Sequence, residues 1–461
     1  MIFALRGLYH PNSEAKGLAR LKFKTFLQEH YPLLGILLGS AMISISLGPY
    51  SSWDSQLEFS AAVGVVKWGF PYTEYGNMIN MQPFGFYVEA LFLWIFGASY
   101  ETAVAVTTMF ALGCVFLTYK VGKLLYGKKT GLFAAALLAL TPWHVIMSRV
   151  FLIDVQCLFF SLLYLYIGIL AIRKSSNGLY FAAGLIFGLA LLTKLFAVFM
   201  LIPLLLIYVY SRPKNPLRTL LSFLLFVIPA FFVQYVWYEP ISGRGLPSIL
   251  NHDDFWIKLP SGFAPSPFFS LNFFSEALGI FFILGYLFAL PVMFLQRKQF
   301  SKSLFLDLAL SVALISIVSF NSYLVFGYNL LIPYVNSIKY DYPILPLFCL
   351  LAASAIKNCF VISKNRDIGG KRHESIVYSA AIGLYLLLVS MIFNFLSLKT
   401  IIEDSWLTFN VPGGLSYSFE SLAAGFDSSQ LWGFQLLGFL LINLGLLLSN
   451  RSKLQSLFSA L

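Results

Sequence analysis

The chain has 461 residues, of which 59% are hydrophobic and only 11% are charged, and its mean hydropathy is +0.79. Soluble domains carry about a quarter charged residues, so this composition excludes a soluble enzyme, and it equally excludes a disordered chain. The net charge of +11 is attributed to basic residues that hold helix ends at a cytoplasmic surface, and no nucleic-acid partner is expected.

Apolar runs of about 20 residues recur along the chain and predict an all-α polytopic membrane protein with about twelve spanning helices. The first run follows a polar segment and is expected to be an anchor helix rather than a cleaved signal. The expected spans are 31–50, 100–125, 129–147, 152–172, 178–192, 195–211, 217–238, 276–296, 303–325, 341–360, 376–397 and 431–449. We expect one transmembrane catalytic domain over 31–449, between a cytoplasmic N-terminal segment, 1–30, and a cytoplasmic tail, 450–461.

One apolar stretch, residues 83–97, is shorter than the others and carries Glu89. Its length of about 15 residues favours an amphipathic helix in the membrane interface over a helix that spans. If it does not span and the N-terminus is cytoplasmic, 24 of the 31 Lys and Arg residues fall on the cytoplasmic side. If it spanned, every later basic loop would move outside, against the positive-inside rule.

The acidic residues and the long loops share the other side of the membrane. Fifteen of the 20 Asp and Glu residues fall outside or at outer helix ends, and the long loops, about 51–99, 239–275 and 398–430, are all outer loops. Because elaborated loops usually carry function, we expect the chemistry at the outer face of the cell membrane.

Asp54 follows the first expected span directly. The segment Ser55–Trp68 predicts an amphipathic helix that lies on the membrane and is ended by Gly69 and Pro71. Asp54 is then the expected N-cap of this helix. The structural interpretation of Asp54 is a cap alone, whereas the functional interpretation is a carboxylate at the water–lipid boundary that acts as a general base.

Asp154 lies near the start of an expected span, five residues after Arg149, and both are placed on the outer side. An ionisable residue about one turn inside an apolar run is a functional candidate. The alternative is an Arg149–Asp154 ion pair that only satisfies both charges.

Lys194 separates two apolar stretches, and Lys339, followed by Tyr340, opens a later expected span. A lone lysine in such a place needs an anion or water, and phosphate is a suitable anion because lysine offers a compact charge to its oxygens. The alternative for Lys194 is that its ammonium reaches the membrane surface along its stem. The alternative for Lys339 is a structural pair with Asp341.

Taken in this order, these features resemble polytopic C-type glycosyltransferases, above all the aminoarabinose-transferase (ArnT-like) branch and the related dolichyl-phosphate-mannose-protein mannosyltransferase-like proteins. The resemblance covers roughly residues 31–210 and the span that begins near 341. It rests on Asp54, the segment ending in GFPY, the stretch QPFGFYVEALFLWIFG, Arg149 with Asp154, Thr193 with Lys194, and Lys339 with Tyr340, Pro343 and Pro346.

The chain departs from the family at two positions. Ser55 stands where the family often has glutamate, and Gln82 stands before Pro83 where the family usually has lysine or histidine. These departures leave the sugar and lipid specificity open. The sequence lacks a WWD motif, so the oligosaccharyltransferase branch is not expected.

The resemblance implies an inverting transfer of one hexose or pentose from a polyprenyl-phosphate donor to an acceptor on the outer face. It implies that Asp54 is the base and that Asp154 holds either the acceptor or a basic residue of the site. The implied donor-phosphate ligands are Arg149, Lys194, Lys339 and Tyr340. Possible acceptor or loop contacts are Glu58, Gln82 and Tyr87.

The implied partners are the lipid-linked donor, membrane lipids and a lipid, glycan or protein acceptor. No bound cofactor is expected, because the donor carries its own leaving group, and a divalent metal stays an open alternative. The rival interpretation is a transporter or lipid flippase. Transporters tend to show repeats and charges at the membrane midplane, whereas the charges here gather near the outer helix ends.

Overall fold

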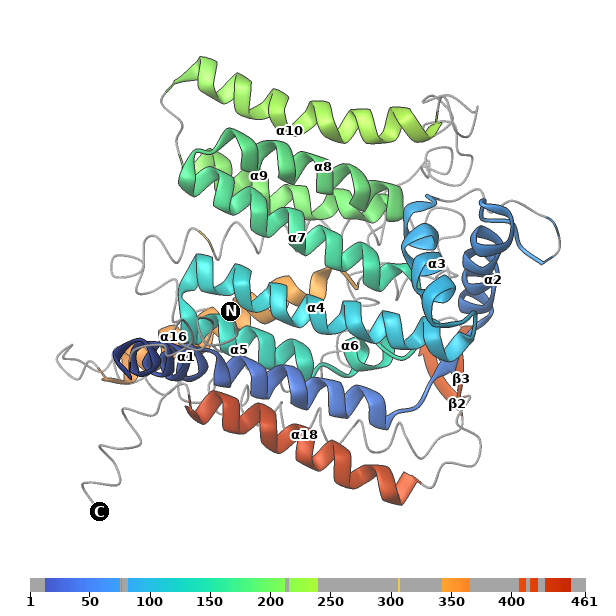
Figure 1. The fold of residues 1–461 in the computed structure, drawn as a ribbon, viewed down its shortest axis with the longest axis horizontal. Coiled ribbons are helices and arrows are strands. Elements are labelled where there is room, and N and C mark those ends of the chain that lie inside the picture. The colour runs from blue at the N-terminus through green and yellow to red at the C-terminus, as the bar shows by residue number, and fades with distance from the viewer. Residues whose placement is uncertain are drawn as a thin grey trace, which may run out of the picture.

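The computed structural model describes residues 13–74, 76, 82–211, 215–238, 306, 342–364, 406–411, 415–421 and 428–448. Long helices lie side by side in this part of the chain and form a bundle (Figure 1). The helices are α1 (Ser13–Ser46), α2 (Trp53–Trp68), α3 (Phe84–Phe96), α4 (Tyr100–Tyr126), α5 (Lys128–Ala139), α6 (Pro142–Met147), α7 (Ile153–Lys174), α8 (Asn177–Thr193), α9 (Leu201–Tyr210), α10 (Pro216–Val236), α16 (Ile344–Lys364) and α18 (Ser428–Leu448), with a 3-10 helix, η1 (Leu195–Met200), between α8 and α9.

The expected spans that fall on described residues coincide with these helices, with three differences in detail. The helix α1 begins at Ser13, so it extends into the expected N-terminal segment. The span 129–147 is divided into α5 and α6 before Pro142, whose ring disfavours helix in the preceding residue. The span 195–211 begins as the 3-10 helix η1. The expected spans 276–296 and 376–397, and 303–325 apart from Leu306, lie outside the described residues.

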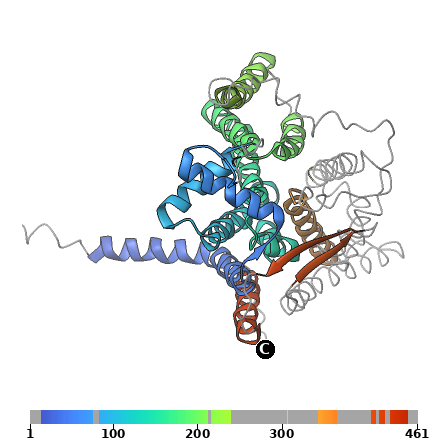
Figure 2. The same ribbon diagram turned by 90° about the vertical axis from the view of Figure 1, so that its right-hand side faces the viewer.

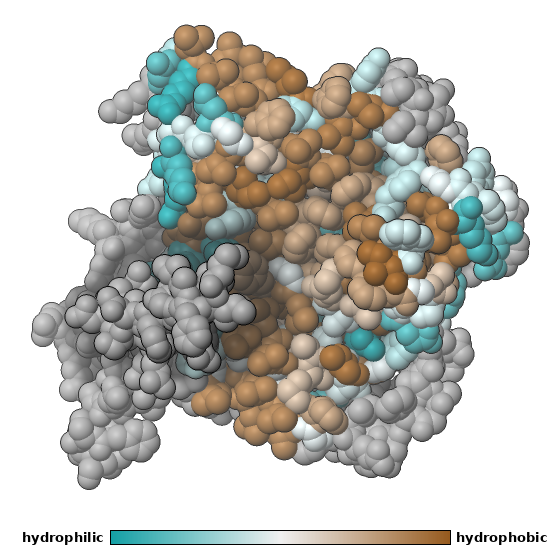
Figure 3. Space-filling model, in the orientation of Figure 1, coloured by the Kyte–Doolittle hydropathy of each residue, from teal (hydrophilic) through white to brown (hydrophobic). Residues whose placement is uncertain are grey.

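Three described helices are long and apolar enough to cross a membrane: α4, α7 and α10. The shorter apolar helices include α3, α8 and much of α1. Many apolar side chains of α10 are exposed, among them Phe223, Phe231 and Phe232. Figure 3 shows hydrophobic residues across the middle of the bundle and hydrophilic residues toward the two ends of the helices. This distribution suits a bundle whose sides contact lipid.

Small residues let the helices approach closely. Gly35 and Gly39 form a GxxxG pattern in α1, and this face packs on Gly438 and Gly445 of α18. A Cβ atom on Gly39 would collide with the carbonyl oxygen of Gly438, so only glycine fits there. The hydrophobic effect does not drive helices together in lipid, because the acyl chains are as apolar as the side chains. Helices associate there through close packing of this kind.

The helices α2 and α3 run crosswise at one end of the bundle (Figure 1). At this end α4 and α7 begin and α8 ends, and we call it the α2–α3 end. Gly69 ends α2 in the left-handed conformation, with φ of 78°, as the sequence predicts. The exposed side of α3 carries Leu91, Trp94 and Phe96. The predicted interfacial placement of both helices stays a prediction.

A small sheet shows that the fold is mostly helical rather than all-α. The strand β1 (Tyr50–Ser51) pairs antiparallel with β3 (Leu415–Ser421), which pairs with β2 (Trp406–Val411), in the order β1-β3-β2. Figure 2, which faces the α2–α3 end, shows β2 and β3 lying across the ends of long helices. The sequence between β2 and β3 is Pro-Gly-Gly, a turn signal between two strand-forming runs that the sequence analysis missed.

Candidate functional site at the α2–α3 end

The first turn of α2 corrects the predicted role of Asp54. The N-cap is Ser52, whose hydroxyl accepts a hydrogen bond from the Ser55 backbone, while the Ser55 hydroxyl accepts one from the Ser52 backbone. Asp54 is the second residue of the helix and is half-buried. Both Ser52 and Asp54 are good caps by residue type, and the reciprocal bonds with Ser55 select Ser52. The N-cap of α2 is therefore Ser52 and not Asp54.

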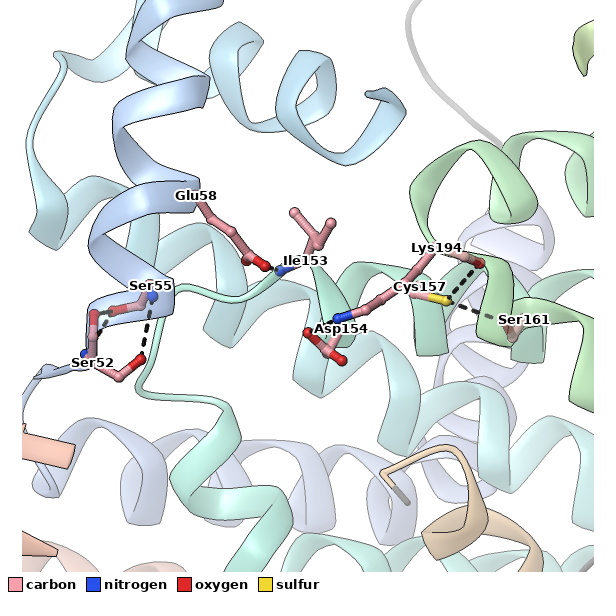
Figure 4. Close-up of polar contacts among 8 residues, drawn as sticks. All are labelled: Ser52, Ser55, Glu58, Ile153, Asp154, Cys157, Ser161 and Lys194. Atoms are coloured by element: carbon pink, nitrogen blue, oxygen red, sulfur yellow. Dashed lines mark hydrogen bonds and ion pairs between the residues drawn. The ribbon is translucent and has the colours of Figure 1, made fainter. Parts of the chain in front are cut away.

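Glu58, one turn further along α2, joins this helix to α7. Its carboxylate accepts a 2.9 Å hydrogen bond from the backbone N–H of Ile153, the first residue of α7. Leu152 precedes α7 and offers no side-chain cap, so Glu58 satisfies one of the orphan N–H groups from a distant part of the sequence. Glu58 is buried, and its negative charge is stabilised by the positive, N-terminal end of the α7 dipole. This contact ties α2 to the first turn of α7, where Asp154 follows Ile153 (Figure 4).

Asp154 and Lys194 form a buried ion pair. The Lys194 ammonium donates a 2.7 Å hydrogen bond to the Asp154 carboxylate, and the two side chains are only 7% and 5% exposed. Figure 4 shows the two side chains pointing toward each other from α7 and from the segment after α8. This pair overturns two of the alternatives: Asp154 does not pair with Arg149, and Lys194 does not extend to the surface.

Lys194 occupies a break in the helical backbone. It follows the last residue of α8 with extended φ and ψ of −163° and 140°, and η1 begins at the next residue. The Sγ atom of Cys157 lies 3.6 Å from the Lys194 carbonyl oxygen, as Figure 4 shows. An interruption at this position turns the lysine stem inward instead of along the helix surface.

Arg149 lies in the connection between α6 and α7 and is hydrogen-bonded to the segment that follows α1. Its Nε donates to the Gly48 carbonyl at 2.8 Å, and its NH1 group donates to the Thr108 hydroxyl at 3.0 Å. The Tyr50 backbone N–H donates to the Arg149 carbonyl at 2.8 Å. Burial lowers the pKa of Arg149 to about 10, so it stays cationic at neutral pH.

The two side-chain hydrogen bonds of Arg149 use only part of the N–H donors of its guanidinium. Its contacts in the described part of the chain are with neutral groups, and no carboxylate of that part lies within 4.0 Å of it. A guanidinium has five N–H donors arranged in a fork that matches carboxylate or phosphate oxygens. Arg149 is therefore a partly buried cation that is suited to hold an anion.

Tyr100 fastens these segments together. Its hydroxyl lies 2.8 Å from both the Tyr50 carbonyl oxygen and the Ser55 hydroxyl, and it accepts a longer bond from the Phe151 backbone N–H at 3.4 Å. Phe59 of α2 packs edge-on against both Tyr100 and Phe151. Through these contacts the start of α4 fixes the first turn of α2 and the connection that carries Arg149.

A buried acid on α3 was not assigned a role from the sequence. Glu89 accepts a 2.9 Å hydrogen bond from the Gln156 side-chain amide, and both residues are fully buried. Burial raises the pKa of Glu89 to about 9, against the smaller opposing effect of the Gln156 bond. The Oε1 atoms of both side chains have no partner among the described residues. The hydrogen bond from Gln156 to Glu89 joins α3 to α7, and the raised pKa of Glu89 favours the neutral acid at this contact.

Two of the remaining predicted contacts, Tyr87 and Gln82, lie in α3 or just before it. The Tyr87 hydroxyl donates to the Gly69 carbonyl at 2.8 Å, and its ring packs on Trp237, so in the described structure it fastens the end of α2. Gln82 is half-buried and stands two residues before α3. Lys339 and Tyr340 lie outside the described residues.

The start of α16 is fixed close to α6. The Tyr342 hydroxyl and His144 Nδ1 are 2.7 Å apart, and the two rings stack with centroids 5.9 Å apart. Both residues are buried. In the described residues no group of three or more His, Cys, Asp or Glu side chains is arranged to hold a metal ion.

Charged residues are sorted between the two ends of the bundle. The acids of α2, α3 and the first turns of α4 and α7 lie at the α2–α3 end: Asp54, Glu58, Glu89, Glu101 and Asp154. The last turns of α4 and α7 and the first turns of α5 and α10, at the opposite end, carry Lys123, Lys128, Lys129, Arg173, Lys174 and Arg218. Arg149, which is partly buried, and Lys194, which is buried, are thus cations at the acidic end of the molecule.

Comparison with known proteins gives a family likeness. Residues 80–237 match the family model described as dolichyl-phosphate-mannose-protein mannosyltransferase. YkcB of Bacillus subtilis (strain 168), which is provisionally named a mannosyltransferase, is 26% identical over 186 residues, which are 38% of this chain and 25% of YkcB. The chain thus spans about a quarter of the length of this curated relative.

The fold is similar to that of ArnT from Cupriavidus metallidurans. The structure of ArnT bound to undecaprenyl phosphate matches with a TM-score of 0.53 and 14% identity, over 90% of this chain and 76% of ArnT. The apo structure of ArnT matches with a TM-score of 0.52 and 14% identity, over 95% and 77% of the two chains. Together with the family match, this confirms the resemblance to C-type glycosyltransferases and indicates a membrane location.

Proposed function

We propose that the protein is a membrane glycosyltransferase that moves one sugar from a polyprenyl-phosphate donor to an acceptor hydroxyl. The observation that carries this proposal is a pair of cations, the partly buried Arg149 and the buried Lys194, at one end of a bundle with apolar sides. A prenyl tail needs apolar helix surfaces, and its phosphate needs cations at the level where those surfaces end. The mannosyltransferase family match and the ArnT fold support the same class of reaction.

In this proposal the cations stabilise the leaving group. The acceptor oxygen attacks the anomeric carbon of the sugar, and the bond from that carbon to the phosphate oxygen breaks with inversion. The departing polyprenyl phosphate gains negative charge, which Arg149 and Lys194 stabilise in a setting of low polarity. Lys339 and Tyr340 are proposed as further phosphate ligands. The reaction needs no bound cofactor, because the donor supplies its own leaving group.

The two aspartates then have different roles. Asp54 is proposed as the general base that takes the proton of the acceptor hydroxyl, because it is a half-buried carboxylate in the first turn of α2, at the same end of the bundle as Arg149 and Lys194. Asp154 already binds Lys194, so it is proposed as the positioning residue that keeps the ammonium at the phosphate. Glu58 is bound to the α7 backbone and is proposed to hold α2 in place.

The site is proposed to face outward across the plasma membrane. The basic residues at the opposite end of the bundle suit a cytoplasmic surface under the positive-inside rule. Both chain ends are then cytoplasmic, and α2 and α3 lie in the outer interface. The acceptor is a hydroxyl of a lipid, a glycan or a protein that reaches this face.

The test is an assay of purified protein with a panel of polyprenyl-phosphate sugars and a mixed acceptor extract. The proposal expects that one donor is cleaved, that polyprenyl phosphate is released in proportion to the protein, and that the sugar appears on an acceptor. A transporter would leave every donor intact and instead move it across the bilayer of a proteoliposome. That result would overturn the proposal.

A further inference from the structure

The opposite end of the bundle contains a cavity that the proposed reaction does not use. A polar cavity of about 260 Å³ opens between the ends of α7 and α9 and the starts of α8 and α10. It adjoins a mouth of about 440 Å³, and Arg218, Ser175 and Asn215 line both. Lys194 lies beyond the far end of α8, and the 17 residues of that helix separate the two places by about 24 Å.

The cavity continues inward as an apolar slot. The two share Ile172, Tyr180, Tyr208 and Ser222, and the slot ends among leucine and phenylalanine side chains that include Phe226. The distance along α10 from Arg218 to Phe226 is about 12 Å. The ring of Tyr180 meets that of Tyr208 edge-on, with centroids 6.5 Å apart.

The slot is open on one side to the lipid-facing surface. Leu205 and Phe223 line it and are 48% and 56% exposed. The slot has a volume of about 70 Å³, which suits only the start of an acyl chain that enters from the bilayer. The space thus combines a polar mouth, a polar chamber and an apolar slot in the order of a headgroup and its chain.

Charge specifies the headgroup. The Arg218 guanidinium is exposed at the mouth, and its NH2 group donates to the Ser175 carbonyl at 2.9 Å. That is one hydrogen bond from a group with five donors. Lys174 directly precedes Ser175, whereas the Arg173 guanidinium donates to the Leu124 carbonyl of α4. Among the described residues no acidic side chain lines the mouth, the chamber or the slot. An anionic phosphate at the mouth would meet complementary charge.

We propose that this cavity binds one anionic phospholipid of the leaflet opposite the α2–α3 end, with its phosphate at Arg218 and the start of an acyl chain in the slot. This lipid would contact both α7 and α10, and it is a different molecule from the glycosyl donor. The site depends only on the membrane location of the protein and not on the proposed sugar transfer.

The test is native mass spectrometry of the purified protein in a neutral detergent. The parent is titrated with phosphatidylglycerol and with phosphatidylcholine of the same acyl chains. We expect one phosphatidylglycerol to bind about tenfold more tightly than phosphatidylcholine, which is the effect of one charge-assisted phosphate contact. Equal binding of the two lipids by the parent overturns the proposal without any variant.

Variants then locate the site. Arg218→Ala should abolish the preference for phosphatidylglycerol, whereas Lys123→Ala, which removes an exposed cation of α4 at the same end, should keep it. If Lys123→Ala loses as much preference, the effect is diffuse surface charge and the cavity is not the site. Competition by glycerol phosphate at the concentration of the lipid would show a soluble-phosphate site instead, and this too would contradict the proposal.

Discussion

Removing the charge of Lys194 tests whether the Asp154–Lys194 ion pair binds phosphate or contributes only to the stability of the helix bundle. Loss of one partner leaves a buried charge without its counterion, which costs about 3–5 kcal/mol of stability. Both side chains are at most 7% exposed, so solvent cannot compensate. We therefore expect Lys194→Met and Asp154→Asn each to be clearly destabilised, and the double variant to recover most of the loss, because neutral pairs replace buried ion pairs well.

Binding of the lipid phosphate that the reaction releases should follow a different pattern across the same four proteins. A charge-assisted contact to phosphate contributes about 1.5–3 kcal/mol, so Lys194→Met should bind undecaprenyl phosphate about tenfold to a hundredfold more weakly. The double variant should stay equally weak although its stability is restored. Thermal unfolding in detergent and lipid titration measure the two quantities, with Lys67→Met as the control for an exposed lysine at the same end. If the double variant binds the lipid as tightly as the parent, Lys194 is a structural residue and the phosphate site must be elsewhere.

Three more predictions concern the topology and the packing of the site. Single cysteines at Lys123 and Glu101, at opposite ends of α4, should be labelled from the cytoplasm and from outside respectively, and the reverse would invert the proposed orientation. Glu89→Gln should raise the thermal midpoint of unfolding. The pKa of Glu89 is about 9 in the folded protein against an ordinary 4.5, so the folding stability of the parent falls as the pH rises from 4.5 to 9. Near pH 7 this loss is about 3 kcal/mol, and glutamine, which does not ionise, avoids it. The gain should shrink toward pH 5, and a gain that does not depend on pH would mean that Glu89 is ionised in the folded protein. Ser52→Ala should cost about 1–2 kcal/mol by loss of the α2 cap, and no cost would contradict the capping assignment.

Local patterns in the sequence predicted the helices well, because membrane helices are specified by runs of apolar residues. The end of α2 at Gly69 could be predicted for the same reason, since a glycine after an apolar run signals a left-handed cap. The choice of Ser52 over Asp54 as the N-cap could not, because both residue types accept backbone hydrogen bonds equally well. The pairing of Ser52 with Ser55 decides it, and this needs coordinates.

The contacts that build the site are mostly long-range, and for that reason the sequence did not reveal them. The sequence offers Asp154 a partner five residues away, Arg149, but its partner is Lys194, 40 residues away across the α7–α8 interface. Glu58 reaches a backbone group 95 residues distant. The sequence could identify rare charges in apolar runs, since each must be satisfied, but it could not identify which group satisfies which.

The most direct test of the central claim is the rate of sugar transfer by Asp54→Asn. Because Ser52 caps α2, asparagine at position 54 should cost at most about 1 kcal/mol, the value of a charge near a helix N-terminus, and the protein should still bind donor. Loss of a general base lowers the rate by about 10²–10⁴-fold, and that is the result we expect. Glu101→Gln, which removes an exposed acid from the first turn of α4 at the same end, should keep the parent's rate. If Asp54→Asn retains more than about a tenth of the parent's turnover, well above what loss of a base allows, Asp54 is not the base and the proposed mechanism is wrong.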